Sequence, residues 1–183
     1  TVRFALAGEK LAVHARVRDA SPRRNEMVRE SSSLEVFAAD RGESIGQVIL
    51  LPQIGDAPSR AFQQVEGRVI AAPDVKLQSK TTPKGYEIAA FVPLSLLPVE
   101  PTDRIMRLEF RTRTHLPDGE LTHGTVFQSG APDRDNLQFG SILIADRVAV
   151  QMEVLSPPLA GPAGKPGRVR LALHNTGDTE ADD

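Results

Sequence analysis

Apolar and polar residues alternate along several short stretches of this chain, and turn residues separate these stretches. Lys10–Arg18 places apolar side chains at every second position, and Ile105–His115 alternates apolar or threonine side chains with arginine, glutamate and histidine. Alternation with a period of two predicts antiparallel strands that bury one face. No segment repeats apolar residues at helical spacing over the length of a helix. The pattern therefore predicts an all-β protein.

The segment Val75–Leu97 carries the clearest local signal and predicts a β-hairpin. Two alternating runs flank a Thr-Pro-Lys-Gly turn, in which Pro83 fixes its own φ angle and Gly85 can take a positive one. Pro93 cannot donate a hydrogen bond to a neighbouring strand, so it should end the second run. One helical turn is expected directly after it, at Leu94–Leu97.

Further apolar runs between turn signals predict more strands, and the polar segment Asp19–Ser32 predicts a loop. About nine strands with long-range return connections favour an antiparallel two-sheet β-sandwich, of jelly-roll or immunoglobulin-like type, over a closed barrel. The additional strands are expected at Leu34–Ala38, Ile45–Leu51, Ala61–Ala71, Thr125–Gln128 and Gly140–Ala145. The inward-facing side chains are expected to include Val13, Val36, Ile88, Leu108, Phe110 and Ile142.

The C-terminal part differs in composition from the rest. Val148–Leu155 and Arg168–Leu173 predict two strands, and a segment rich in proline and glycine separates them. The residues after the second strand, from His174 to Gly177, are typical of the opening hairpin of an immunoglobulin-like module. We therefore expect one sandwich over residues 1–147, followed at 148–183 by a linker and the truncated start of a second, immunoglobulin-like domain.

Composition excludes several classes of site. The chain has 183 residues and no cysteine, which removes disulfides, thiolate nucleophiles and zinc–thiolate centres. Its 22 basic and 24 acidic residues are interspersed, so no basic patch for nucleic acid or an anionic membrane is predicted. No apolar run approaches the roughly 20 residues of a membrane-spanning helix. The sequence also lacks a nucleophile elbow and a phosphate-binding loop, and we expect no enzymatic activity.

Four motifs follow one another in a familiar order. They are Val17-Arg18-Asp19, Ser33-Leu34-Glu35-Val36-Phe37, Gly85-Tyr86-Glu87 followed by Val92-Pro93-Leu94, and Phe139-Gly140-Ser141-Ile142-Leu143. Through them the stretch from Lys10 to Ile144 resembles the family 9 carbohydrate-binding modules and the wider DOMON-like sandwiches. The resemblance implies a β-sandwich appended to secreted glycoside hydrolases and other surface proteins.

Some members of that family bind a sugar between two tryptophans, whereas this chain has no tryptophan, one tyrosine and seven phenylalanines. The resemblance places Phe127 at the second tryptophan and gives the first no equivalent. It therefore implies a ligand site with Phe127 as the platform, Gln128 and Asn136 as amide partners, and Arg111 and Arg113 as donors to hydroxyl or acidic groups. The alternatives are that Phe127 is a core residue, that the amides cap loops, and that the arginines lie on a solvated sheet face.

A structural calcium ion is the one candidate cofactor. Asp19, Glu35 and Asp40 lie at or near strand ends, and carboxylate oxygens are the ligands that calcium prefers. The resemblance places Ser32 at the position of an aspartate that helps to hold calcium in the family. The alternative is that these carboxylates cap turns.

Taken together, the sequence predicts a non-catalytic accessory module of a larger exported bacterial protein that binds carbohydrate weakly. The alternative is a structural or protein-interaction domain that has lost the sugar slot. The expected partners are carbohydrate and neighbouring domains of the same polypeptide, without nucleic acid or a membrane span. The expected location is secreted, periplasmic or on the cell surface.

Overall fold

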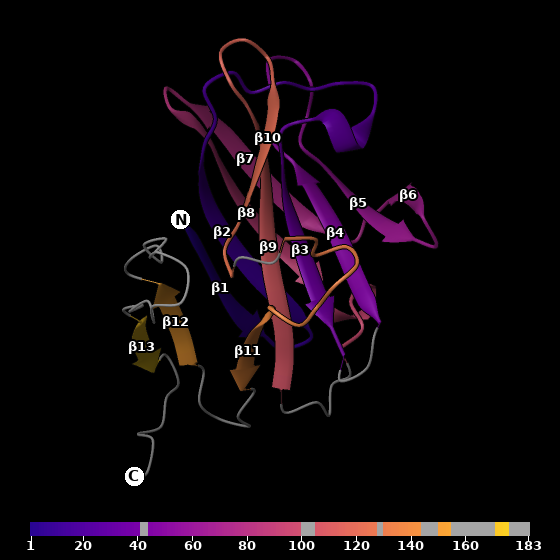
Figure 1. Ribbon diagram of the computed structural model, residues 1–183, viewed down its shortest axis with the longest axis vertical. Helices are drawn as coiled ribbons and strands as arrows, with labels where there is room; N and C mark the ends of the chain where they lie inside the picture. Colours follow the sequence, from indigo (N-terminus) through magenta and orange to yellow (C-terminus); the bar gives the residue numbers. More distant parts are fainter. Residues whose placement is uncertain (41–43, 100–104, 128–129, 144–149, 155–170, 176–183) are drawn as a thin grey trace.

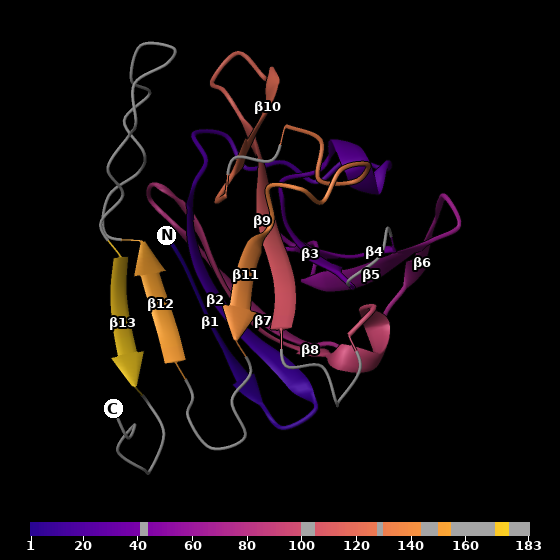
Figure 2. The same cartoon turned by 60° about the horizontal axis from the view of Figure 1, so that its bottom comes forward.

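A computed structural model of the protein describes residues 1–40, 44–99, 105–127, 130–143, 150–154 and 171–175 (Figure 1). Within these ranges the chain forms thirteen strands and two single turns of 3-10 helix. The strands up to β11 form two antiparallel sheets. Since buried side chains from both sheets form one core cluster, the predicted antiparallel two-sheet β-sandwich is confirmed (Figure 2).

The smaller sheet has four strands. Their order is β1 (Val2–Ala7), β2 (Lys10–Arg18), β8 (Gly85–Pro93) and β7 (Lys76–Thr82).

The larger sheet runs across the other face of the core. Its order is β10 (Leu121–Thr125), β9 (Ile105–His115), β3 (Ser33–Ala39), β4 (Ile45–Leu51), β5 (Arg60–Val65) and β6 (Arg68–Ala71), and β11 (Gly140–Leu143) also pairs with β9.

Alternation along the strands builds the core as predicted. On β2, the side chains at Leu11, Val13, Ala15 and Val17 are buried, while those between them are half-buried or exposed. The ring of Phe110 on β9 stacks on a phenylalanine of β1, with centroids 5.2 Å apart. Five of the six predicted core side chains are buried, and the sixth is half-buried against the cluster.

The predicted hairpin is present as β7 and β8, and Gly85 explains why its turn needs glycine. Gly85 has φ 140°, and a Cβ atom there would lie 2.2 Å from the carbonyl oxygen of Val17 on β2. Any side chain would therefore push the turn away from the neighbouring strand. The strand ends at Pro93, and the helical turn follows as the 3-10 turn η2 (Leu94–Leu96).

Two predicted strands were wrong in detail. Ala61–Ala71 is not one strand but the hairpin of β5 and β6, because Glu66 and Gly67 both adopt positive φ angles, 48° and 80°, and form a two-residue turn. The strand expected at Thr125–Gln128 is β10, which ends at Thr125. It begins earlier because it pairs with the end of β9 directly after the hairpin tip.

Two strands share one edge of β9, and Glu109 organises the point where they part. β10 pairs with residues 111–115, and β11 pairs with residues 105–108. The wholly buried carboxylate of Glu109 accepts hydrogen bonds from the backbone amides of Phe110, Val126 and Phe127 at 2.8, 3.0 and 2.9 Å. This carboxylate therefore fixes where the chain leaves the sheet.

The C-terminal pair of strands lies where the sequence predicted strands. β12 (Val150–Val154) and β13 (Leu171–Asn175) pair antiparallel with each other. The assignment of residues 148–183 to a second domain stays a prediction. No helix in the described ranges has the length and apolar character needed to cross a lipid bilayer.

Candidate functional site

The arginine-bearing face of β9 is covered rather than solvated. Glu109, Arg111 and His115 are 0, 7 and 4% exposed. Loop residues that lie far away in the sequence cover this face, since Arg111 Nη1 lies 3.0 Å from a carboxylate oxygen of Asp133 and Arg113 Nη1 donates to the carbonyl of Arg29 at 2.6 Å. The alternative of a solvated sheet face is therefore wrong for these side chains.

Glu35 on β3 is the centre of this polar cluster. Its wholly buried carboxylate accepts hydrogen bonds from Arg111 Nε and Arg113 Nε, both at 2.6 Å, and from Gln47 Nε2 at 3.1 Å. The guanidinium of Arg111 also lies over the ring of Phe37, 5.0 Å from its centroid. We call Glu35, Arg111, Arg113, Gln47 and Asp133 the arginine cluster.

Asp133 supplies the second negative charge of the arginine cluster. Partial burial raises the pKa of its carboxyl. A backbone hydrogen bond and the charge of Arg111 together lower this pKa by more, so the net shift is downward. Two carboxylates thus face two guanidinium groups. The arginine cluster is close to neutral, and its members satisfy one another.

The three predicted calcium ligands lie apart. Both oxygens of Glu35 are engaged by arginines, and Asp19 Oδ1 accepts the backbone amides of Ser21 and His115, each at 3.1 Å. Asp19 thus lies near the start of β3, whereas Asp40 follows its end. In the part of the chain that the structure describes, no three acidic or histidine side chains gather as a metal site. The structure therefore does not bring these carboxylates together around one cation.

The residues expected to accompany the arginines lie elsewhere. Phe127 is half-buried against the core cluster, and its ring lies so close over Gly140 that a Cβ atom there would be 2.5 Å from it. The backbone carbonyl of Asn136 accepts a hydrogen bond from Arg107. Gln128 lies outside the described residues. A role of these residues in binding stays a prediction.

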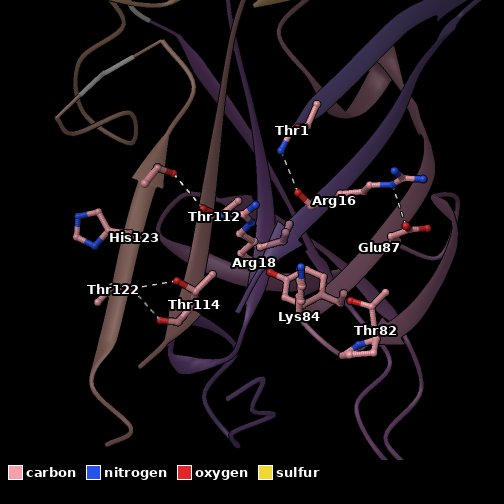
Figure 3. A pocket seen from close by; sticks show the side chains of 14 residues that line it. Thr1, Arg16, Arg18, Thr82, Lys84, Glu87, Thr112, Thr114, Thr122 and His123 are labelled. Carbon is pink, nitrogen blue, oxygen red and sulfur yellow. Dashed lines mark hydrogen bonds and ion pairs between the residues drawn. The ribbon is translucent and has the colours of Figure 1, made fainter. Parts of the chain in front are cut away.

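The structure also forms a pocket that the sequence did not predict, where β2 and the β7–β8 turn face β9 and β10. It has a volume of about 890 Å³ (Figure 3). We call it the inter-sheet pocket. Its lining comes from both sheets and from segments far apart in the sequence, so no local motif could have indicated it.

Threonine hydroxyls form one wall of the inter-sheet pocket. Thr114 Oγ1 and Thr122 Oγ1 lie 2.9 Å apart, and Thr122 Oγ1 also donates to the carbonyl of Thr114 at 3.3 Å. Thr112 Oγ1 donates to the carbonyl of Gly124 at 3.3 Å. Each hydroxyl has one proton, and these bonds use it. This wall therefore presents mainly oxygen lone pairs, which accept hydrogen bonds.

Cationic side chains form much of the remaining lining. Arg16 Nε lies 2.8 Å from one carboxylate oxygen of Glu87, and Lys80 Nζ lies 2.8 Å from the other. A hydrogen bond from Lys80, together with the charges of Lys80 and Arg16, holds the pKa of Glu87 below its usual value. Arg18 and Lys84 are exposed and have no ion-pair partner among the described residues.

The floor of the inter-sheet pocket connects it to the arginine cluster. Tyr86 is 1% exposed, and its hydroxyl donates to the carbonyl of Arg113 at 3.5 Å. Burial raises the pKa of Tyr86, and the nearby Asp19 and Glu35 raise it further, so the phenol stays neutral. Its ring belongs to the core cluster, and no phenylalanine, tyrosine or tryptophan ring is exposed among the described residues that line the pocket.

Comparisons with known proteins bear on the fold. No protein-family model matches the chain, and no curated protein sequence matches it significantly. Among solved structures, it is similar to a family 9 carbohydrate-binding module from Caldicellulosiruptor kristjanssonii in complex with cellotriose, with a TM-score of 0.56, 18% identity, and coverage of 80% of this chain and 77% of that chain.

A structure of such a module from the same organism in complex with glucose gives a TM-score of 0.55 at 18% identity, and covers 80% of this chain and 78% of that chain. Similarity at this level of identity shows a shared fold alone. The fold that the sequence resemblance implied, that of a family 9 carbohydrate-binding module, is thereby confirmed.

Proposed function

We propose that this chain is a non-catalytic carbohydrate-binding module of a larger exported protein, and that the inter-sheet pocket holds the sugar. The similar structures contain cellotriose and glucose, which supports a sugar as the ligand. The observation that carries the proposal is the polar lining of the pocket, whose volume lies within the range of roughly 300–1,000 Å³ typical of small-molecule sites.

The lining of the inter-sheet pocket suits the chemistry of a sugar. Every sugar hydroxyl both donates and accepts hydrogen bonds. The wall of Thr112, Thr114 and Thr122 supplies acceptors, while Arg18 and Lys84 in the remaining lining supply donors only. A sugar in the pocket could therefore satisfy both. Without an exposed aromatic ring to stack on, the sugar should bind weakly.

The arginine cluster is the second candidate location. Arg113 keeps 19% of its side chain exposed and Asp133 keeps 40%, so a ligand can reach both. Glu35 would then hold the guanidinium in place for a sugar hydroxyl. The arginine cluster ranks second because its charges already satisfy one another.

Glycan-array screening followed by calorimetry tests the function and its location. Thr112→Val removes a hydroxyl from the pocket wall, and Thr81→Val is a matched control, because Thr81 lies outside the pocket and also donates one side-chain hydrogen bond to a backbone carbonyl. We expect Thr112→Val to weaken sugar binding about three- to tenfold and Thr81→Val to leave it unchanged.

Two other outcomes would contradict parts of this proposal. Weakening by Arg113→Gln but not by Thr112→Val, with thermal unfolding showing that both variants fold, would place the sugar at the arginine cluster. The absence of binding to neutral and acidic glycans would favour the alternative of a structural or protein-interaction domain that has lost the sugar slot.

A further inference from the structure

The inter-sheet pocket is positively charged, although the whole chain carries a formal charge of −2. Three cationic side chains line it, Arg16, Arg18 and Lys84, against one carboxylate, Glu87. Glu87 is engaged by Arg16 and also by Lys80 from outside the pocket. The surplus charge is therefore located on Arg18 and Lys84.

The position of this surplus positive charge relative to the threonine wall determines which chemical groups a matching ligand needs. Figure 3 shows Thr112, Thr114 and Thr122 on one side of the pocket and Arg16 and Glu87 on the other, with Arg18 and Lys84 drawn between them. A matching ligand presents hydroxyl donors to the threonines and an anionic group to Arg18 and Lys84. A neutral sugar can accept hydrogen bonds from these two cations but does not compensate their charge.

We infer that the ligand of the inter-sheet pocket is an anionic oligosaccharide whose carboxylate or sulfate group lies against Arg18 and Lys84; this rests on the proposed function. A sugar acid combines ring hydroxyls with an anion on one small ring. Guanidinium and ammonium groups bind carboxylate and sulfate oxygens through charge-assisted hydrogen bonds. Salt weakens such contacts because both cations are exposed.

The arginine cluster does not compete for the same ligand. Glu35 takes a hydrogen bond from both of its guanidinium groups, and Asp133 takes another from Arg111. An anion there would have to displace a carboxylate that is already hydrogen-bonded. The cationic lining of the inter-sheet pocket has no such internal competitor at Arg18 or Lys84.

Calorimetry with three trisaccharides tests the inference on the full chain. The first probe is trigalacturonate, and the second is its methyl ester, which is the same sugar without the charges. The third is a trisaccharide without carboxylates that carries a sulfate group. Arg18→Gln and Lys84→Gln each remove one cation, and Lys76→Gln is the matched control, since Lys76 is exposed on β7 and outside the pocket.

We expect an anionic probe to bind more tightly than the methyl ester, with the advantage shrinking at 0.5 M salt. Each pocket variant should weaken binding of the anionic probe about two- to fivefold and weaken binding of the ester less, because the ester loses a hydrogen-bond donor but no charge pairing. Lys76→Gln should change neither. A response confined to the sulfated probe would assign a sulfate group, and one confined to trigalacturonate a carboxylate.

The contrary outcomes separate this inference from the proposed function. If acid and ester bind equally and Thr112→Val weakens both, the anionic ligand is wrong and the sugar pocket stands. If an anionic probe binds but Arg18→Gln and Lys84→Gln change nothing, the assignment to these two cations is overturned. If none of the three probes binds while a neutral glycan does, the inference falls and the proposed function remains.

Discussion

The arginine cluster and the inter-sheet pocket lie on opposite faces of the same strand, and they use polar residues in opposite ways. Along β9, Arg111 and Arg113 point to the outer face, while Thr112 and Thr114 line the pocket. On the outer face the charges neutralise one another under a covering loop. On the pocket side, hydroxyls and cations keep unused hydrogen-bonding capacity.

The difference lies in what each polar group has as a partner, not in how polar it is. Burying a charge is costly unless another charge and hydrogen bonds compensate it, so the arginine cluster has to be complete. An exposed cation such as Arg18 is solvated by water, so it needs no partner within the protein and stays available to a ligand. We therefore expect substitutions in the arginine cluster to change stability, and those in the pocket to change binding.

The largest expected effect is the loss of the carboxylate at the centre of the arginine cluster. Glu35→Ala leaves two guanidinium groups facing each other without their shared partner, which should lower the free energy of unfolding by about 3–5 kcal/mol. Urea unfolding at pH 7 measures this. A loss below about 1 kcal/mol would show that solvent reaches the cluster and compensates the charges, and the contrast between the two faces would then fail.

The second effect concerns the turn that forms one side of the pocket. Gly85→Ala places a Cβ atom against the carbonyl oxygen of Val17, in a backbone conformation that alanine rarely adopts. We expect a loss of about 2–3 kcal/mol in unfolding free energy. Gly55→Ala is a control that also has a positive φ but meets no neighbouring atom within 4 Å, and it should cost less. Equal losses would show that the backbone angle alone, and not the close approach to β2, makes glycine necessary.

Much of the fold could be predicted from the sequence because alternation is a local signal. The limits of β9 and the buried face of β2 follow from the alternation of residues two positions apart. The turn between β7 and β8 follows from Pro83 and Gly85. The hairpin of β5 and β6 was missed because its turn is Glu66-Gly67 and lacks the asparagine or aspartate that usually marks a two-residue turn.

The polar sites could not be predicted in the same way because their partners are distant. Glu35 is 76 residues from Arg111 and 78 from Arg113, and from the sequence alone its carboxylate near a strand end indicates a calcium ligand as readily as an ion pair. Alternation shows that Arg111 and Arg113 share a face, but not whether a loop covers that face. The inter-sheet pocket depends on how strands of the two sheets face each other, which no periodicity encodes.

A smaller effect on stability is expected on the pocket side of β9. Thr114→Val keeps the shape of a half-buried side chain and removes one hydroxyl, so it should change the free energy of unfolding by less than about 1 kcal/mol. It should still weaken sugar binding, because the lost oxygen faces the pocket. Thermal unfolding and calorimetry on the same sample separate the two effects. A large loss of stability with unchanged binding would place Thr114 with the structural residues.

The smallest effect is the acid response of Glu87, which joins Arg16 and Lys80 beside the pocket. The hydrogen bond from Lys80 and the two positive charges lower the pKa of this carboxyl in the folded protein. The folded state therefore keeps Glu87 charged at a pH where the unfolded chain binds a proton. Its contribution to stability is complete above the ordinary pKa of 4.5 and is lost as the pH falls through the lower, folded value.

Glu87→Gln should consequently be slightly less stable than the unmodified protein at pH 7, and the two should converge near pH 3. Urea unfolding at both pH values measures this, and Glu26→Gln, an exposed position outside the pocket, should show no difference at either. A Glu87→Gln difference that persists at pH 3 would mean that the carboxylate contributes through packing rather than through its charge. The cationic lining would then depend less on this ion pair than the comparison of the two faces requires.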